Sequence, residues 1–252
     1  MLEDILILVP ILLVLIMIFN IFIYALNYQR YKQSSYYRIT RNPYFDILSD
    51  TGKSGEYSIY KKLKFLEKDR NKILFNLYIP RENNKFTEID IVLLTAKGLF
   101  VIESKNFKGW IFGNENQKMW TQTLPSGYNC HKEQFYNPIK QNSTHIKYLR
   151  KIITDSIPIE SIIVFSDSCT FKNVNVNSST NVIHEHQLIY LIKSLLNDLP
   201  TILSKNQVDI YYNKLLPYTK VDKKTKNKHI QSIKSLKNKN SSLHSKKTLN
   251  NK

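Results

Sequence analysis

An apolar segment near the start of the chain restricts what the protein can fold into more than any other feature of the sequence. Residues 5–26 form a run of 22 residues that only Pro10, Asn20 and Tyr24 interrupt. As a helix with a rise of about 1.5 Å per residue, this run would extend roughly 33 Å, enough to cross a hydrocarbon core of about 30 Å. Because the run is apolar on all sides, it predicts a membrane-spanning helix rather than a helix of a soluble core.

The residues on either side of this segment indicate its orientation. Glu3 and Asp4 precede it and no small-residue cleavage site follows it, which argues against a secretory signal peptide. Basic residues follow it at positions 30, 32, 38 and 41, and basic flanks stay in the cytoplasm. We therefore expect a single-pass protein of the cell (plasma) membrane, with residues 1–4 outside, residues 5–26 in the lipid bilayer, residues 27–50 as a juxtamembrane linker and the rest of the chain in the cytoplasm.

The other end of the chain is polar and basic. Residues 218–252 contain 11 lysines and one acid, Asp222, so this segment contributes 11 − 1 = +10 to a net charge of +17. Its few apolar residues cannot bury enough surface to fold alone, which predicts a disordered tail. Such a tail could contact nucleic acid or anionic lipid, or it could be a solvated appendage of a chain rich in lysine and asparagine. The two cysteines, Cys130 and Cys169, match no metal-binding spacing and predict free thiols.

Residues 51–217 show a mixture of helical and strand patterns typical of one domain. The periodicity predicts an alternating pattern of helices and strands, an α/β fold. Helices are expected at residues 54–68, from Pro138 onward, and near 187–199 and 207–216; strands are expected at 72–80, 88–95, 99–107, 160–167 and 182–184, with a small hairpin at 110–120. The motif TGKS at residues 51–54 lacks the glycine that a phosphate-binding loop places five residues before Gly52, because Ile47 stands there, so we exclude a nucleotide-binding loop.

Charged residues continue the apolar rows of two neighbouring strands. Alternate residues of a strand share a face, so Asp90 falls in the row of the apolar residues after it, and Glu103 and Lys105 continue the apolar row before them. A hairpin that pairs Leu94 with Leu99 also sets Asp90 opposite Glu103, with Cβ atoms roughly 5 Å apart. Two carboxylates so placed repel each other unless a cation bridges them, and Mg²⁺ prefers oxygen ligands. The alternative is that Glu103 and Lys105 form an exposed ion pair, which would contribute under about 1 kcal/mol to stability.

The order of several short motifs resembles a known family. The motifs are SGE at residues 54–56, EIDIVLL at 88–94, GLFVIESKNFKGWIFG at 98–113, Trp120, and NPIKQN at 137–142. Together they resemble the nuclease-related domain (NERD) family of the PD-(D/E)xK nuclease superfamily, over roughly residues 52–164. The proline of the superfamily's name is absent, since Glu88 and Ile89 precede Asp90. The resemblance implies a restriction-endonuclease-like core, which is a central mixed sheet flanked by helices. It also implies a metal-dependent phosphodiesterase that acts on nucleic acid, with DNA favoured over RNA.

The resemblance also implies roles for individual residues. Asp90 and Glu103 would hold Mg²⁺ or Mn²⁺, and Glu56 would reach the metal from the first helix. Lys105 would orient the attacking water, and Gln141, on the polar side of its helix with His145, would line the site. Glu56 could instead serve only the helix N-terminus, and Gln141 could be an ordinary surface residue. The alternative function is a catalytically silent nucleic-acid-binding module of the same fold, tethered to the membrane.

Overall fold

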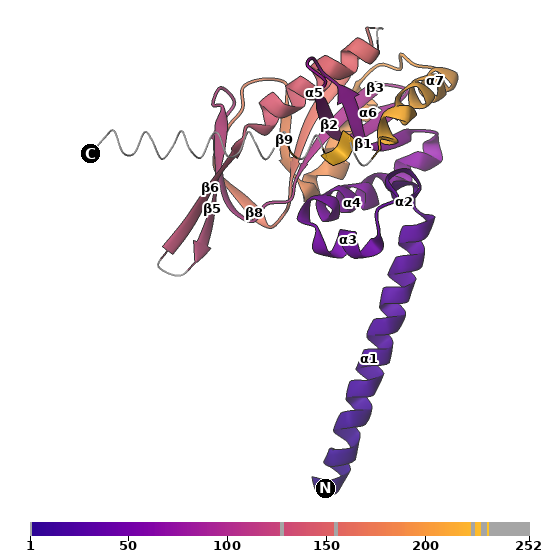
Figure 1. Cartoon of the computed structure of the whole chain (residues 1–252), viewed down its shortest axis with the longest axis vertical. Helices are drawn as coiled ribbons and strands as arrows, with labels where there is room; N and C mark the ends of the chain where they lie inside the picture. The colour runs from indigo at the N-terminus through magenta and orange to yellow at the C-terminus, as the bar shows by residue number, and fades with distance from the viewer. Residues whose placement is uncertain (1, 127–128, 154–155, 223–224, 228–230, 232–252) are drawn as a thin grey trace, which may run out of the picture.

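The computed structural model describes residues 2–126, 129–153, 156–222, 225–227 and 231. The chain begins with α1 (Leu2–Gln33), a helix of 32 residues that extends away from the folded domain (Figure 1). Among the described residues, it is the one helix long and apolar enough to cross a membrane. The apolar side chains from Ile7 to Ile23 are exposed, so this part of α1 does not belong to the core of the domain.

The segment after the apolar run is folded rather than an extended linker. Residues 27–50, expected as a juxtamembrane linker, contain the end of α1 and two short helices, α2 (Ser35–Thr40) and α3 (Tyr44–Ser49). Tyr31 and Tyr36 are fully buried. Their rings pack against Tyr57 at 5.2 Å and 5.4 Å between centroids, and Tyr57 belongs to the next helix of the domain. The tyrosines therefore make this segment part of the domain core, a role that its basic residues alone did not indicate.

A mixed five-stranded sheet forms the centre of the domain. Its strand order is β1-β2-β3-β7-β9, in which β1, β2 and β3 are antiparallel and β3, β7 and β9 are parallel. The bounds are β1 (Lys72–Pro80), β2 (Phe86–Thr95), β3 (Gly98–Lys105), β7 (Ile159–Phe165) and β9 (Asn181–His184). The predicted register is confirmed, because Leu94 pairs with Leu99. Gly98 closes the β2–β3 turn at φ +133°, and a Cβ there would lie 2.6 Å from the carbonyl oxygen of Pro158.

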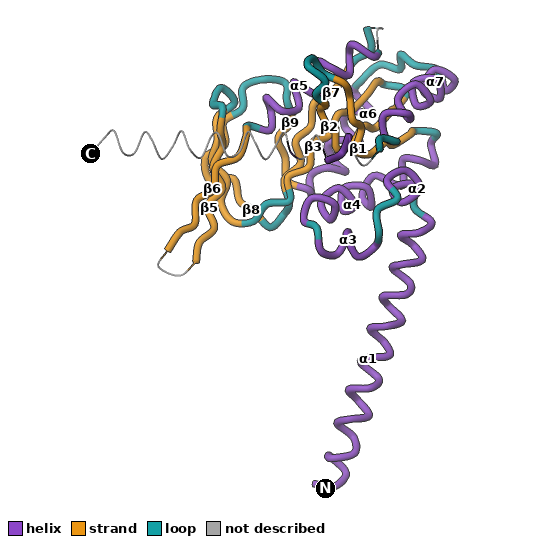
Figure 2. Tube along the Cα trace, in the orientation of Figure 1, coloured by secondary structure: helices purple, strands orange, loops and turns teal. Residues whose placement is uncertain are grey.

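Helices cover both faces of this sheet (Figure 2). On one face lie α4 (Thr51–Leu63) and α6 (Leu188–Asp198), whose apolar residues share a core with Ile91, Phe100 and Ile102. On the other face lie α5 (Pro138–Ile152) and α7 (Lys205–Leu215), which pack on Val92 and Val101. Short 3₁₀ helices occur at η1 (Lys64–Asp69), η2 (Glu185–Gln187) and η3 (Leu216–Thr219). The predicted α/β fold, a mixed sheet flanked by helices with a long apolar N-terminal helix, is confirmed.

A second sheet lies beside the first and is larger than the small hairpin predicted at residues 110–120. Its order is β6-β5-β4-β8, with bounds β4 (Gly109–Asn114), β5 (Met119–Ser126), β6 (Asn129–Tyr136) and β8 (Cys169–Asn175). Trp120 is fully buried and stacks on Phe165 of β7 at 6.2 Å between ring centroids, which joins the two sheets. The sequence did not indicate β6 or β8, because neither segment is a continuous apolar or alternating run.

The end of the domain extends slightly beyond residue 217. Tyr218 packs against the core on the α7 face and Thr219 is buried, so these two residues belong to the fold. Most of the predicted tail, at residues 223–224, 228–230 and 232–252, lies outside the described residues. Cys130 is exposed and Cys169 is buried, and both are free thiols as predicted.

Candidate active site

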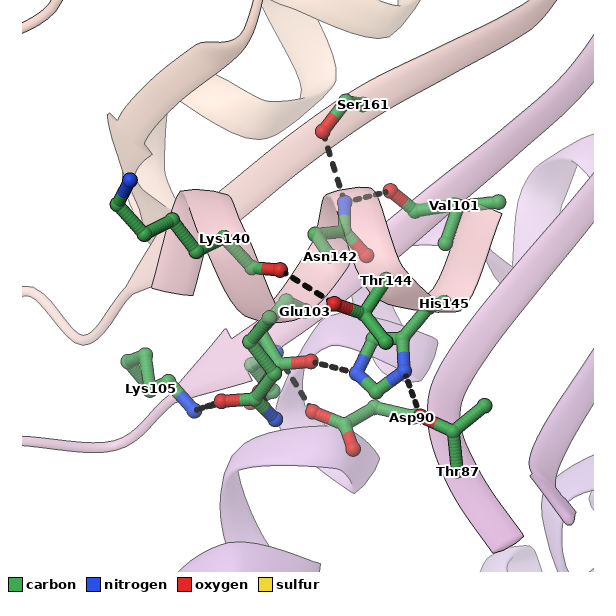
Figure 3. Close-up of polar contacts among 12 residues, drawn as sticks. Thr87, Asp90, Val101, Glu103, Lys105, Lys140, Asn142, Thr144, His145 and Ser161 are labelled. Carbon is green, nitrogen blue, oxygen red and sulfur yellow. Dashed lines mark hydrogen bonds and ion pairs between the residues drawn. The ribbon is translucent and has the colours of Figure 1, made fainter. Parts of the chain in front are cut away.

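Asp90 and Glu103 lie next to one another where β2 and β3 stop pairing (Figure 3). The backbone ladder ends at the pair of Ile91 and Ile102, one step before these two residues. Beyond it, the Asp90 side chain replaces the backbone partner, because its Oδ2 accepts a hydrogen bond of 2.8 Å from the N–H of Ser104. The hairpin register deduced from the sequence thus brings these two carboxylates together.

The Glu103 carboxylate is buried and accepts hydrogen bonds from three side chains. Its Oε1 accepts from Lys105 Nζ at 2.5 Å and from Gln141 Nε2 at 2.6 Å. Its Oε2 contacts His145 Nε2 at 3.0 Å, and the other ring nitrogen of His145 contacts the hydroxyl of Thr87 at 2.6 Å. Burial raises the pKa of Glu103, but the charge of Lys105 and the hydrogen bond from His145 outweigh burial and leave this pKa below its ordinary value.

The start of α5 explains why Gln141 and His145 reach Glu103. They are four residues apart and therefore share one face of the helix. Asn137 caps the helix and its Nδ2 donates to the carbonyl oxygens of Glu115 at 2.8 Å and Gln117 at 2.7 Å. Asn142 is also buried, and its Nδ2 donates to the carbonyl oxygen of Val101 at 3.0 Å. The two asparagines of NPIKQN therefore attach α5 to both sheets, and this attachment positions Gln141.

Glu56 approaches the same end of the sheet from the opposite face, on α4. Gly55 precedes it, and a Cβ at Gly55 would lie 2.9 Å from both Ser104 Oγ and Asn106 Cβ, so only glycine lets α4 approach β3 this closely. The Glu56 Oε2 atom accepts hydrogen bonds from Tyr36 Oη and Asn76 Nδ2, each 3.0 Å long. Burial raises the pKa of Glu56 to about 7.

Asn76 interrupts β1 opposite Asp90. Its backbone is left-handed, with φ 51°, and it lies between the paired residues Phe75 and Leu77. Its side chain lies between two acids, since Nδ2 is 3.0 Å from Glu56 and 3.4 Å from Glu88. Its Oδ1 is buried and has no hydrogen-bond partner within the part of the chain that the structure describes. Asn76, Tyr36 and Thr87 were not predicted from the sequence; only Asn76, a polar residue inside an apolar strand, offered a signal.

The acids at this end of the sheet repel one another. Burial raises the pKa of Asp90 well above its ordinary value, the charges of Glu103 and Glu56 raise it further, and Lys105 and the Ser104 N–H oppose this only in part. Within the described ranges, no three His, Cys, Asp or Glu side chains form a preformed metal cage. The donors present are carboxylate oxygens and the unpaired oxygen of Asn76. This set fits Mg²⁺, which needs few carboxylates and retains several water ligands.

Comparisons with known proteins identify the family of the domain. The nuclease-related domain family, NERD, matches residues 51–166, which include Glu56, Asp90, Glu103, Lys105 and Gln141. A protein of Bacillus anthracis described as uncharacterized is 33% identical over 184 residues, which are 72% of this chain and 83% of that protein. No solved structure matches the chain significantly. The chain therefore belongs to the nuclease-related domain family.

Proposed function

We propose that this protein is a membrane-anchored, metal-dependent nuclease that hydrolyses phosphodiester bonds in DNA. The observation that carries the proposal is the meeting of Asp90 and Glu103 from neighbouring strands, with Lys105 held on Glu103 at 2.5 Å. Buried charges of this kind are costly unless they are paired or coordinate a metal ion. The family match supports a nuclease-like domain.

In this proposal, Asp90 and Glu103 hold Mg²⁺ or Mn²⁺, and Glu56 contributes directly or through a water molecule. The ion, when bound, supplies a Lewis acid for the phosphoryl oxygen and lowers the pKa of a water molecule. A bound cation would also offset burial and the charges of Glu103 and Glu56, which together raise the pKa of Asp90.

Lys105 orients the attacking water and stabilises negative charge that develops on the phosphate. Its ammonium group has three protons. Contacts with Glu103 at 2.5 Å and Gln141 at 3.1 Å use two of them, so the third can reach a water molecule or a phosphate oxygen. Gln141 acts as a positioning residue, because it bonds to both Glu103 and Lys105. A fixed ammonium group in a site with little water stabilises developing charge better than one in solution.

One observation favours a second candidate function, a catalytically silent module that binds nucleic acid. Both oxygens of Glu103 already accept hydrogen bonds from Lys105, Gln141 and His145. Such saturation also suits a site in which protein side chains have replaced a metal ion.

A cleavage assay separates the two functions. We expect the full chain in detergent to nick supercoiled plasmid and degrade linear DNA with Mg²⁺ or Mn²⁺, but not with EDTA. Asp90→Asn and Lys105→Ala should each lower the cleavage rate at least about 100-fold, the scale seen when one group that stabilises the transition state is removed, without loss of DNA binding. The matched controls are Asp209→Asn and Lys214→Ala on the exposed side of α7. Cleavage that survives the site variants would refute the assignment, and binding without cleavage in every metal would favour the silent module. Single-stranded DNA and RNA substrates in the same assay test the preference for DNA.

The membrane part of the proposal is that α1 spans the plasma membrane with the domain in the cytoplasm. The support is the length and exposure of α1 and the basic residues at its domain end, Arg30 and Lys32. Protease added outside intact cells should leave the domain uncut and should digest it after the cells are opened. Digestion of the domain in intact cells would reverse the orientation.

A further inference from the structure

Helix α3 exposes two large apolar side chains close to the anchor helix. Phe45 is 71% exposed and Leu48 is 59% exposed. They are three residues apart and share one face of α3, whereas Ile47 is buried in the core on the α4 face of the main sheet. Single exposed apolar residues are common on soluble proteins. Whether this face of α3 contacts another surface therefore depends on where it lies relative to α1.

The depth of α3 along the anchor helix is fixed by aromatic contacts. Tyr44, the first residue of α3, packs on Tyr24 and Tyr28 of α1, with ring centroids 5.5 Å and 5.8 Å apart. These two tyrosines lie where the apolar run of residues 5–26 ends, and tyrosine is enriched at the boundary between lipid and water. If α1 spans the bilayer, α3 therefore lies at the level of the lipid headgroups.

Packing contacts hold α3 at this depth along α1. α1 continues without a break to Gln33, beyond the tyrosines that contact α3. Tyr31 of α1 is fully buried and packs on both Tyr44 and Tyr57, at 5.1 Å and 5.2 Å between ring centroids. These contacts join α1, α3 and α4 into one unit. Figure 1 shows α3 at the edge of the domain from which α1 emerges.

We propose that α3 is a second membrane contact, which inserts Phe45 and Leu48 into the interface of the same bilayer that α1 spans. This inference rests on the proposed anchoring by α1 and adds a fixed orientation of the domain on the membrane. The contact made by α3 itself is apolar, because the charged residue of this helix, Asp46, pairs with Lys53 at 2.6 Å. Helices that lie in the interface bury Trp, Phe and Leu side chains at the boundary between headgroups and acyl chains.

The test measures the depth of single labels in the full chain, reconstituted in phosphatidylcholine liposomes. In a Cys130→Ser background, Phe45→Cys and Leu48→Cys carry an environment-sensitive fluorophore. Tyr190→Cys on α6, where the native side chain is 81% exposed, is the matched control for an exposed position on the domain. Leu15→Cys in the middle of the apolar run reports whether α1 is inserted. Cys169 is buried and is left unchanged. The Cys130→Ser chain without an added cysteine measures the background labelling.

We expect spin-labelled lipids to quench the labels at positions 45 and 48 at least three-fold more strongly than the label at position 190, with the reverse order for iodide in the buffer. If position 15 is quenched by lipid while positions 45 and 48 behave like position 190, the inference is wrong and the anchoring stands. If position 15 is not quenched by lipid, the anchoring fails and the inference fails with it. Protection of positions 45 and 48 that depends on protein density in the liposome would show contact with a second copy and would also overturn the inference.

Discussion

Three acids lie at one end of the sheet, Glu56, Asp90 and Glu103. Their surroundings shift their pKa values in different directions. Glu103 faces Lys105 and His145, which keep its pKa low. Burial and neighbouring negative charges raise the pKa of Asp90, and burial raises the pKa of Glu56 to about 7. Without a cation, the site therefore favours one ionised carboxylate and two that tend to hold protons, whereas a bound cation would favour ionisation of all three.

The raised pKa of Glu56 predicts a pH dependence of stability. Between its ordinary pKa of 4.5 and about 7, the folded state binds more protons at Glu56 than the unfolded state does. The free energy of unfolding should therefore fall as the pH rises through this range, by up to about 3 kcal/mol in metal-free buffer. Glu56→Gln should remove this part of the slope. Thermal unfolding at pH 5 and pH 8 with EDTA checks it, with exposed Asp209→Asn as the control. A slope that is the same in Glu56→Gln and the parent protein would contradict the prediction.

At the scale of elements, the site depends on how closely α4 and α5 approach the sheet. Asn137 and Asn142 attach α5 through hydrogen bonds to backbone carbonyl groups. α4 approaches the sheet closely because Gly55 has no side chain, and this approach brings Glu56 toward Asp90. The geometry of the carboxylates is therefore sensitive to small shifts of these two helices.

Two glycines of α4 provide a matched comparison. Gly55→Ala should destabilise the domain by about 1–3 kcal/mol, because its Cβ would lie 2.9 Å from Asn106 Cβ and Ser104 Oγ. It should also reduce cleavage by displacing Glu56. Gly52→Ala should be neutral or stabilising by up to about 1 kcal/mol, since its nearest contact is 3.3 Å from Asp50 and alanine favours a helix. Chemical denaturation of both variants measures the difference in the free energy of unfolding. An equal effect at both positions would show that the contact at Gly55 tolerates an added methyl group.

At the scale of the whole molecule, the C-terminal end of α1 and the domain are one folded unit. Tyr31 at the end of α1 and Tyr36 in α2 are fully buried. Tyr36 packs on Phe75 of β1, with ring centroids 4.9 Å apart, and its hydroxyl donates to Glu56. The segment that follows the apolar run thus contributes both to the core and to the site.

Truncations should separate the apolar run from the folded segment. A chain that lacks residues 1–26 keeps Tyr31 and Tyr36 and should fold. A chain that lacks residues 1–50 loses both and exposes apolar surface on α4 and β1, which should cost at least about 3 kcal/mol and lower the Tm by at least about 6 °C. Circular dichroism during heating compares the two fragments. Equal Tm values would show that residues 27–50 are only a linker.

The salt dependence of DNA binding tests whether the basic end of the chain contacts DNA. A chain that ends at Asp222 keeps the packed residues Tyr218 and Thr219 but lacks ten lysines. If the tail binds DNA, the affinity should fall and the slope of log affinity against log salt should become less steep by about 0.9 for each phosphate that the tail neutralises. A tail of the same length with glutamine in place of lysine is the control for length. An unchanged slope in both variants would make the tail a passive appendage for DNA binding.

The sequence by itself determined the features that depend on neighbouring residues. The apolar run produced α1, and the short turn before Gly98 set the register that brings Asp90 beside Glu103. Helical spacing placed Gln141 and His145 on one face of α5. These features follow from periodicities and short connections, which act within a few residues of chain.

Only the tertiary structure decided which distant residues join them. Tyr36 and Asn76 are each 20 residues from Glu56 in the sequence, and β8 pairs with β4 across about 60 residues. The packing of residues 27–50 likewise depends on Tyr57 and Phe75, which later elements supply. Such contacts depend on the path of the whole chain, because no local pattern encodes which buried surface a tyrosine or an edge strand will meet.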